Sequence, residues 1–364
     1  MFKNMKLGKK LIIGFLLVGV IPFLVVSILS VNKSSEALIN LEKHTLEAIK
    51  TIKKDQIENY MNVINGLKNL IQYHEEAKIS ATGEYEMNVQ NENITKTYDE
   101  IYSEVNESLK MFPEEFGYYD IFLICEKHGH VMYSWAKESD LGENLSSGQY
   151  RDSHLAQAIW KEARKDDEVH ISDFKPYAPS NGAPAMFVGR RVKDNDGNPL
   201  GIVAVQIPLS EINEIMQERT GMGETGETYL VGEDYLMRSD SFLDPVNRTV
   251  EASLSGTVER NGVRTKASER ALQGISETQE IIDYNGNPVM SSYDVIEFDD
   301  FKWAIIAEID MSEALHAVNS LTYFIIIVGV IGVILISLFG IGFARYITTP
   351  ITKLVNVIQK GVNG

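Results

Sequence analysis

The stretch Leu321–Phe343, LTYFIIIVGVIGVILISLFGIGF, contains 23 consecutive residues without a charge. A second uncharged stretch near the start of the chain, Leu11–Val31, LIIGFLLVGVIPFLVVSILSV, contains 21 residues. A helix needs about 20 residues to cross the hydrocarbon core of a bilayer, so each stretch is long enough to span it. We therefore predict transmembrane helices at residues 11–32 and 321–343, with residues 33–320 between them.

Charge divides the chain at the same two stretches. All 51 Asp and Glu residues lie between them. Seven of the 34 Lys and Arg residues lie on the outer flanks, namely Lys3, Lys6, Lys9, Lys10, Arg345, Lys353 and Lys360. The enclosed region therefore carries 27 cations against 51 acids, a net charge of −24. Because cationic flanks stay inside, we predict a cytoplasmic N-terminus (residues 1–10) and an extracytoplasmic region (residues 33–320). The acidic charge of the enclosed region predicts no nucleic acid partner.

The first apolar stretch is predicted to be an uncleaved anchor rather than a signal peptide. Its apolar core is longer than the roughly 7–15 residues typical of a signal peptide. The segment Val31–Glu36 follows it, and this segment contains no small-x-small cleavage site. The chain is therefore predicted to be a two-span protein of the cell membrane.

Apolar residues follow a helical period directly after the first span. They recur mostly at spacings of three, four or their sums from Leu38 to Ile71, which predicts an amphipathic helix about 50 Å long. The polar segment Lys78–Glu92 interrupts this pattern, and a second helix is predicted over Ile94–Met111. We interpret the first helix as a structural stalk.

The period then changes to that of β-strands. A hairpin turn is predicted at Glu126–Gly129 and a short helix at His154–Arg164. The predicted strands are Tyr119–Cys125, His130–Ala136, Val169–Phe174, Ala185–Val192, Gly201–Ile207, Glu227–Gly232, Val289–Ile296 and Trp303–Ile309. This mixture of helices and strands predicts an antiparallel sheet flanked by helices, the α+β arrangement.

The second half of the enclosed region looks like a smaller copy of the first. Asp194–Pro199 and Asp283–Pro288 both end in Gly-Asn-Pro, and they begin 89 residues apart. Asp-Gly and Asn-Gly supply the positive φ angles that tight hairpin turns require. The repeated hairpin supports a prediction of two stacked modules.

Two segments resemble a known family. Met222–Ser241, MGETGETYLVGEDYLMRSDS, resembles the start of a membrane-proximal Cache module, and Arg345–Leu354, RYITTPITKL, is similar to the first helix of a HAMP linker. The whole chain thus resembles a double-Cache sensor joined to HAMP, as in methyl-accepting chemotaxis proteins. This resemblance implies two PAS-like modules on one long helix, at about 112–209 (distal) and 222–310 (proximal), with a HAMP start at 344–364.

The resemblance also implies function. It implies a homodimer, a small-molecule ligand in the distal module, and a signal that passes through the second span and HAMP to an output domain beyond residue 364. Chemoreceptors, histidine kinases and nucleotide cyclases share this arrangement, and a chemoreceptor is our leading hypothesis. A membrane-tethered binding protein without signalling is the third hypothesis, although the segment around Pro350 argues against it.

No catalytic chemistry is predicted for the chain. Gly221–Gly226 fits G-x-G-x-x-G, but it follows a helix-like stretch, Ser210–Arg219, whereas a dinucleotide motif follows a strand and opens a helix. We therefore predict a turn there. His128 and His130 are interpreted as part of a solvated turn rather than a metal site, and the single cysteine, Cys125, as a buried, inert thiol. No metal or cofactor is predicted, and the chain is predicted not to be an enzyme.

Two tracts are candidates for the ligand site, Gly148–Ser153 and Asp173–Ser180, and by resemblance they line the distal pocket. Arg151 is predicted to bind an anionic group, although a surface ion pair with Asp152 is an equal alternative. The aromatic candidates have ordinary core packing as their alternative. The candidate residues are Tyr133, Trp135, Tyr150, Arg151, Ser153, Asp173, Tyr177, Ser180 and Gln206.

The sequence departs from the amino-acid-binding double-Cache sensors at two places. These sensors carry R-x-W-Y and a later Asp that holds the ligand's amine. Here Tyr150–His154 reads Y-R-D-S-H, and Gln206 takes the place of the Asp. An amide does not pair with an ammonium as a carboxylate does, so the sequence predicts a small polar or anionic ligand, such as an organic acid.

Overall fold

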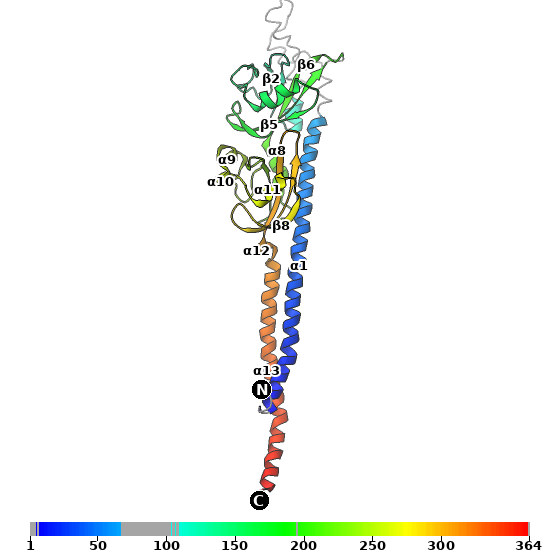
Figure 1. Cartoon of the computed structure of the whole chain (residues 1–364), viewed down its shortest axis with the longest axis vertical. Coiled ribbons are helices and arrows are strands. Elements are labelled where there is room, and N and C mark those ends of the chain that lie inside the picture. Colours follow the sequence, from blue (N-terminus) through cyan, green and yellow to red (C-terminus); the bar gives the residue numbers. More distant parts are fainter. Residues whose placement is uncertain are drawn as a thin grey trace, which may run out of the picture. The chain divides into compact units, whose positions relative to one another are not determined.

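The computed structural model describes residues 5, 7–66, 103, 106, 109–193 and 196–362 (Figure 1). The chain forms two compact units, of which one comprises residues 1–42 and 311–364 and the other residues 43–310. The predicted polar segment Lys78–Glu92 and most of the predicted helix Ile94–Met111 lie outside the described residues.

The helices are α1 (Leu7–Gly66), α6 (Met111–Phe116), the π-helix η1 (Leu155–Trp160), α7 (Lys161–Ala163), α8 (Leu209–Gln217), α9 (Val250–Ser255), α10 (Val258–Asn261), α11 (Lys266–Leu272), α12 (Met311–Ala314) and α13 (His316–Val362). The strands are β1 (Asp120–Ile124), β2 (Val131–Ser134), β3 (His170–Ile171), β4 (Lys175–Tyr177), β5 (Ala183–Lys193), β6 (Pro199–Ile207), β7 (Glu227–Gly232), β8 (Glu277–Ile282), β9 (Pro288–Glu297) and β10 (Lys302–Asp310).

The first unit pairs the start of α1 with α13. Both helices are long and apolar enough to cross a membrane, with mean hydropathies of 2.9 and 3.1 in their most apolar windows. Glycines lie where the helices meet, because a Cβ added at Gly19 would come within 2.7 Å of Ile336, and one at Gly329 within 2.7 Å of Phe23. Small residues permit this close approach of membrane helices.

The second unit contains two antiparallel sheets (Figure 1). The six-stranded sheet has the order β2–β1–β6–β5–β3, with β4 paired to β5, and the four-stranded sheet has the order β7–β10–β9–β8. We call the part from α6 to β6 the first module and the part from β7 to β10 the second module. The α+β fold with two sheet modules is therefore as predicted.

One hydrophobic cluster joins α1 to both modules. Ile57 and Met61 of α1 pack in the same cluster as Tyr133 of the first module and Trp303 of the second. Nearer the start of α1, the Nζ of Lys50 donates a hydrogen bond to Ser276 Oγ of the second module at 2.9 Å. The two modules thus stack on the long helix, which confirms that part of the predicted architecture.

The predicted hairpins are present where the residues are described. The turn between β1 and β2 has Gly129 at a φ of +79°, and the turn between β8 and β9 has Gly286 at +88°. Part of the predicted turn Asp194–Pro199 lies outside the described residues. The predicted strand Val169–Phe174 was too long, because only the two residues of β3 pair with β5 before the chain turns away.

At Gly189 on β5, η1 approaches the six-stranded sheet closely. A Cβ at this position would lie 2.3 Å from Ile159 Cγ2 and 3.0 Å from the carbonyl oxygen of Val203. We expect Gly189→Val to lower the free energy of unfolding by about 1–3 kcal/mol, because the larger side chain displaces η1. Urea unfolding followed by tryptophan fluorescence measures this loss, with Ala183→Val at an exposed position of the same strand as the control. Equal stability of the two variants would contradict the prediction.

Candidate functional site

The face of the six-stranded sheet that packs against η1 and α7, here called the inner face, holds a group of buried polar side chains. Asp120 of β1, Gln206 of β6 and Phe187 of β5 lie directly opposite one another in the sheet. Directly opposite residues of antiparallel strands project from the same face. Phe187 packs with Ile159 and Trp160 of η1, so Asp120 and Gln206 also belong to the inner face.

Asp120 is fully buried and holds three hydrogen bonds. Its Oδ2 accepts from Ser134 Oγ at 2.7 Å, and its Oδ1 accepts from the backbone N–H of Ile121 at 2.7 Å and of Ala136 at 3.0 Å. Burial, with a smaller contribution from the neighbouring Asp140, raises the pKa of Asp120 to about 7 despite these bonds.

Asp140 is the second fully buried carboxyl of the group. Its Oδ2 accepts a hydrogen bond from the hydroxyl of Tyr177 on β4 at 2.6 Å. Burial raises the pKa of Asp140, and Glu138 adds to the increase, whereas the Tyr177 bond opposes it. Burial and the adjacent carboxylate also raise the pKa of Tyr177, which keeps its hydroxyl a donor.

Two oxygens of this group have no hydrogen-bond partner, namely Asp140 Oδ1 and Gln206 Oε1. Their residues are 0% and 4% exposed. A buried acceptor without a donor costs about 1–3 kcal/mol, so buried polar atoms are normally satisfied. The inner face therefore presents two acceptors that a bound molecule with hydrogen-bond donors would satisfy.

His154 supplies a neutral aromatic wall beside these groups. Its Nε2 donates a hydrogen bond to the carbonyl oxygen of Ala185 at 2.9 Å, and its ring lies 4.8 Å from that of Phe187 and 5.5 Å from that of Tyr177. Burial lowers the pKa of His154 to about 4, so the imidazole is uncharged at neutral pH. The apolar surface for a ligand thus comes from three rings.

The structure brings some of the predicted site residues to the inner face. Tyr177 and Gln206 lie there, and Tyr150 packs against the same cluster, with its hydroxyl 2.6 Å from Ser139 Oγ. Ser180 donates to Glu138 Oε2 at 2.6 Å beside the Asp140 carboxyl. These four positions come from three separate segments of the chain.

Other predicted residues lie elsewhere. Tyr133 and Trp135 pack in the cluster on the opposite face of the sheet. This position corresponds to ordinary core packing, the alternative given for the aromatic candidates. The Arg151 side chain is 58% exposed, and its Nε lies 3.5 Å from Asp152 Oδ2, as in the alternative of a surface ion pair. Ser153 Oγ accepts a hydrogen bond from the backbone N–H of Ala156 at 3.2 Å.

Asp173 connects the two modules. Its Oδ1 accepts from Arg238 Nε at 2.7 Å and from the indole N–H of Trp303 at 2.8 Å, while its Oδ2 accepts from Arg238 Nη2 at 2.6 Å. The rings of Phe174 and Trp303 stack beside this bond, with centroids 6.1 Å apart. Gly232 makes room for the guanidinium, since a Cβ there would lie 2.4 Å from Arg238 Cζ.

Sequence reasoning missed Asp120, Asp140 and His154 as members of the site. Asp120 had a usable signal, because a carboxylate inside the apolar strand Tyr119–Cys125 must be buried on one face or the other. Asp140 lies in a segment with no regular period and His154 at the start of a predicted helix, and the surroundings of both depend on residues more than 30 positions away in the chain.

Two antiparallel α+β modules on one long helix, with a buried polar group under a short helix, define a sensor-domain fold. The chain belongs to the Cache domain family, which matches residues 34–318. The HAMP resemblance begins after this match ends and stays a prediction. No curated protein matches the sequence.

Solved structures with the same fold come from two kinds of receptor. The sensor domain of the V. cholerae histidine kinase DctB has a TM-score of 0.51 and 14% identity, covering 76% of this chain and 98% of that one. The ligand-binding domain of the Campylobacter jejuni chemoreceptor Tlp3 in complex with 4-methylisoleucine has a TM-score of 0.50 and 10% identity, covering 76% and 94%. The same domain with L-valine has a TM-score of 0.50 and 10% identity, covering 77% and 97%. At these identities the likeness shows the fold.

Proposed function

We propose that the chain is the sensory part of a two-span membrane receptor whose first module binds a small polar ligand that carries an amino group. The observation that carries this proposal is the pair of buried, unpartnered acceptors, Asp140 Oδ1 and Gln206 Oε1. An ammonium group has three N–H donors and no acceptor, and it forms its strongest hydrogen bonds with carboxylates.

Charge supports the same ligand chemistry. The inner face contains the buried carboxyls of Asp120 and Asp140, and both have raised pKa values because burial and a neighbouring carboxyl disfavour their charged forms. A bound ammonium favours the ionised form of each, so binding recovers part of the desolvation cost of these groups. Arg151, the cation expected to bind an anionic ligand, is exposed instead. We therefore retain the predicted polar ligand and favour an amine over an organic acid.

The relatives of the same fold are consistent with an amine. The two Tlp3 complexes contain 4-methylisoleucine and L-valine, which both carry an α-amino group. In this chain Gln206 stands where the amino-acid sensors have their Asp, and Asp120 lies directly opposite it on β1. A second buried carboxyl, besides that of Asp140, thus lies beside Gln206 on the neighbouring strand.

We propose that the receptor is a chemoreceptor. A histidine kinase is the second candidate, because the fold of this sensor region occurs in both kinds of receptor. In this proposal the chain forms a homodimer, has no catalytic site of its own, and passes the signal along α13 into a HAMP domain that begins at residue 344. Deleting residues 344–364 is expected to abolish the response and leave ligand binding intact. A retained response would favour the tethered binding protein.

A thermal-shift series on the full chain in detergent tests the ligand class. The series compares molecules of equal length that differ only in their ends, namely an alkylamine, the matching amino acid and the matching carboxylate. A ligand at 100 times its dissociation constant adds about 2.7 kcal/mol to the free energy of unfolding. We expect the two amino compounds to raise the melting temperature and the plain carboxylate to have no effect. Stabilisation by the carboxylate alone would refute the amine.

A further inference from the structure

The second module has a buried polar group of its own, on strands that run next to one another. Glu227 of β7, Glu308 of β10 and Ser291 of β9 lie directly opposite one another across the four-stranded sheet. They are 2%, 3% and 0% exposed. Their side chains therefore project into the same buried layer, on the side covered by α11.

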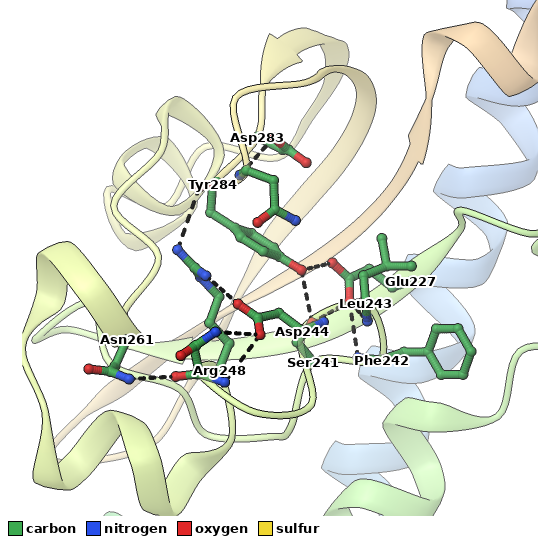
Figure 2. Close-up of polar contacts among 11 residues, drawn as sticks. Glu227, Ser241, Phe242, Leu243, Asp244, Arg248, Asn261, Asp283 and Tyr284 are labelled. Carbon is green, nitrogen blue, oxygen red and sulfur yellow. Dashed lines mark hydrogen bonds and ion pairs between the residues drawn. The ribbon is translucent and has the colours of Figure 1, made fainter.

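Figure 2 shows how the surrounding residues hold Glu227. Its Oε2 accepts from Ser241 Oγ at 2.7 Å and from the backbone N–H groups of Phe242 and Leu243 at 3.1 and 3.2 Å. Its Oε1 accepts from the hydroxyl of Tyr284. Burial raises the pKa of Glu227, and these fixed donors on both of its oxygens oppose the increase because they favour the charged form.

Glu308 has a different set of contacts. Its Oε2 accepts a single hydrogen bond, from the hydroxyl of Tyr229 at 2.8 Å. Its Oε1 has no partner, and neither has Ser291 Oγ. A negative charge on this carboxyl would therefore have one hydrogen bond, from Tyr229, and otherwise only the nearby Ser291 hydroxyl to favour it. A proton on the carboxyl removes the cost of burying that charge.

The charged groups around Glu308 also oppose its ionisation. Burial, with smaller contributions from Glu227 and Asp283, raises its pKa to about 8. The arginines that contact Tyr284 and Tyr293 are each already paired with a carboxylate. Arg248 lies over the ring of Tyr284 and pairs with Asp244 at 2.6 Å, and Arg270 donates to Tyr293 and pairs with Glu277 at 2.6 Å.

We propose that Glu308, with Glu227 as its charged neighbour, is a proton-binding site through which the second module senses external acidity. This input is separate from the small ligand of the first module. Loss of the proton places a second negative charge beside Glu227, in a layer where both side chains are buried. Glu308 is two residues from the end of β10, which continues in the chain into α12 and α13. A change in β10 is therefore passed on through the adjoining helix.

The test measures the α1–α13 distance by electron paramagnetic resonance in the full chain. Spin labels are attached to Glu36→Cys and Asn319→Cys, which are exposed positions of α1 and α13, in a Cys125→Ser background. The labelled chain is diluted with unlabelled chain, so that only pairs within one molecule are measured. The pH is varied from about 6 to about 10, on either side of the expected transition. The test variant is Glu308→Gln. The control variant is Glu280→Gln, which replaces an exposed glutamate of the same sheet.

We expect the distance distribution of the unsubstituted protein to change with a midpoint near pH 8, and that of Glu280→Gln to change in the same way. Glu308→Gln imitates the protonated side chain, so its distances should stay at their acid values throughout. A distribution that does not change with pH overturns the proposal, and so does a Glu308→Gln variant that still responds. If this variant does not fold, Glu308→Asp replaces it. A shifted midpoint then supports the proposal, and an unchanged midpoint overturns it.

Stability gives an independent readout with a defined sign. The folded protein keeps the Glu308 proton above pH 4.5, the usual pKa of a glutamate, whereas the unfolded chain loses it there. The free energy of unfolding should therefore fall as the pH rises from 4.5 to about 8, and level off above this range. The free energy of unfolding should fall less steeply with pH in Glu308→Gln than in Glu280→Gln. An equal slope in the two variants would contradict the proposal.

Discussion

An Arg238→Ala variant is expected to lose about 3–5 kcal/mol of its free energy of unfolding, the usual effect of removing one partner of a buried ion pair. Arg238 is 3% exposed, and its guanidinium binds both oxygens of Asp173. Its removal leaves a carboxylate at the module interface with only two N–H donors, the indole of Trp303 and the backbone of Phe174, and without a cation. The loss is measured by urea unfolding, with the fluorescence of Trp303 as the local signal.

Two further variants separate this effect from a general loss of charge. Arg264→Ala removes an arginine that is 63% exposed and pairs with Glu269, so it should be far less destabilising than Arg238→Ala. Arg238→Lys keeps the charge but not the two parallel hydrogen bonds, so its loss should be intermediate. If Arg238→Ala were no more destabilising than Arg264→Ala, the ion pair would not hold the modules together.

Replacing Asp140 with asparagine is expected to weaken binding of the most stabilising amine in the thermal-shift series by about 30-fold or more, equivalent to roughly 2 kcal/mol. The substitution keeps the size of the side chain and an acceptor for Tyr177. It removes the negative charge and one of the two acceptor oxygens that face the site. Calorimetric titration of the full chain measures the change in the dissociation constant.

Asp152→Asn is the matched control, because Asp152 is 83% exposed and lies outside the inner face. Its affinity should equal that of the unsubstituted chain. Arg151→Ala tests the opposite charge preference and should also leave binding of the amine unchanged. If Arg151→Ala abolished binding while Asp140→Asn had no effect, the anionic ligand predicted from the sequence would replace the amine.

Regular periods made most of the fold predictable. The predicted strand Glu227–Gly232 coincides with β7, and the turn at Asp283–Pro288 joins β8 to β9 as expected. Gly221–Gly226 lies in a turn, with Gly221 at a φ of +81°. Helices α9, α10 and α11 were not predicted, because six, four and seven residues are too few for a helical period to show. Thr265, which caps α11 in a capping box, was the signal available for one of them.

The site was less predictable, for a physical reason. The tract Asp173–Ser180 was expected to bind ligand as one loop, yet Asp173 points to the second module and Tyr177 to the inner face. The partner of Asp173 is 65 residues further along the chain, and no local pattern reports a contact over that distance. Side chains from one loop can therefore contact two different modules, and the sequence alone does not predict which module each side chain contacts.

The bond between Asp173 and Arg238 also limits how receptors of this kind can be recombined. A chimaera that joins this first module to the second module of another sensor would bury Asp173 without its guanidinium partner. A side chain at the position of Gly232 would be equally harmful, because it would occupy the space of that guanidinium. Exchange of sensing modules should therefore succeed only when Asp173, Gly232, Arg238 and Trp303 are transferred as a set. Replacing ligand specificity within the first module leaves this set untouched.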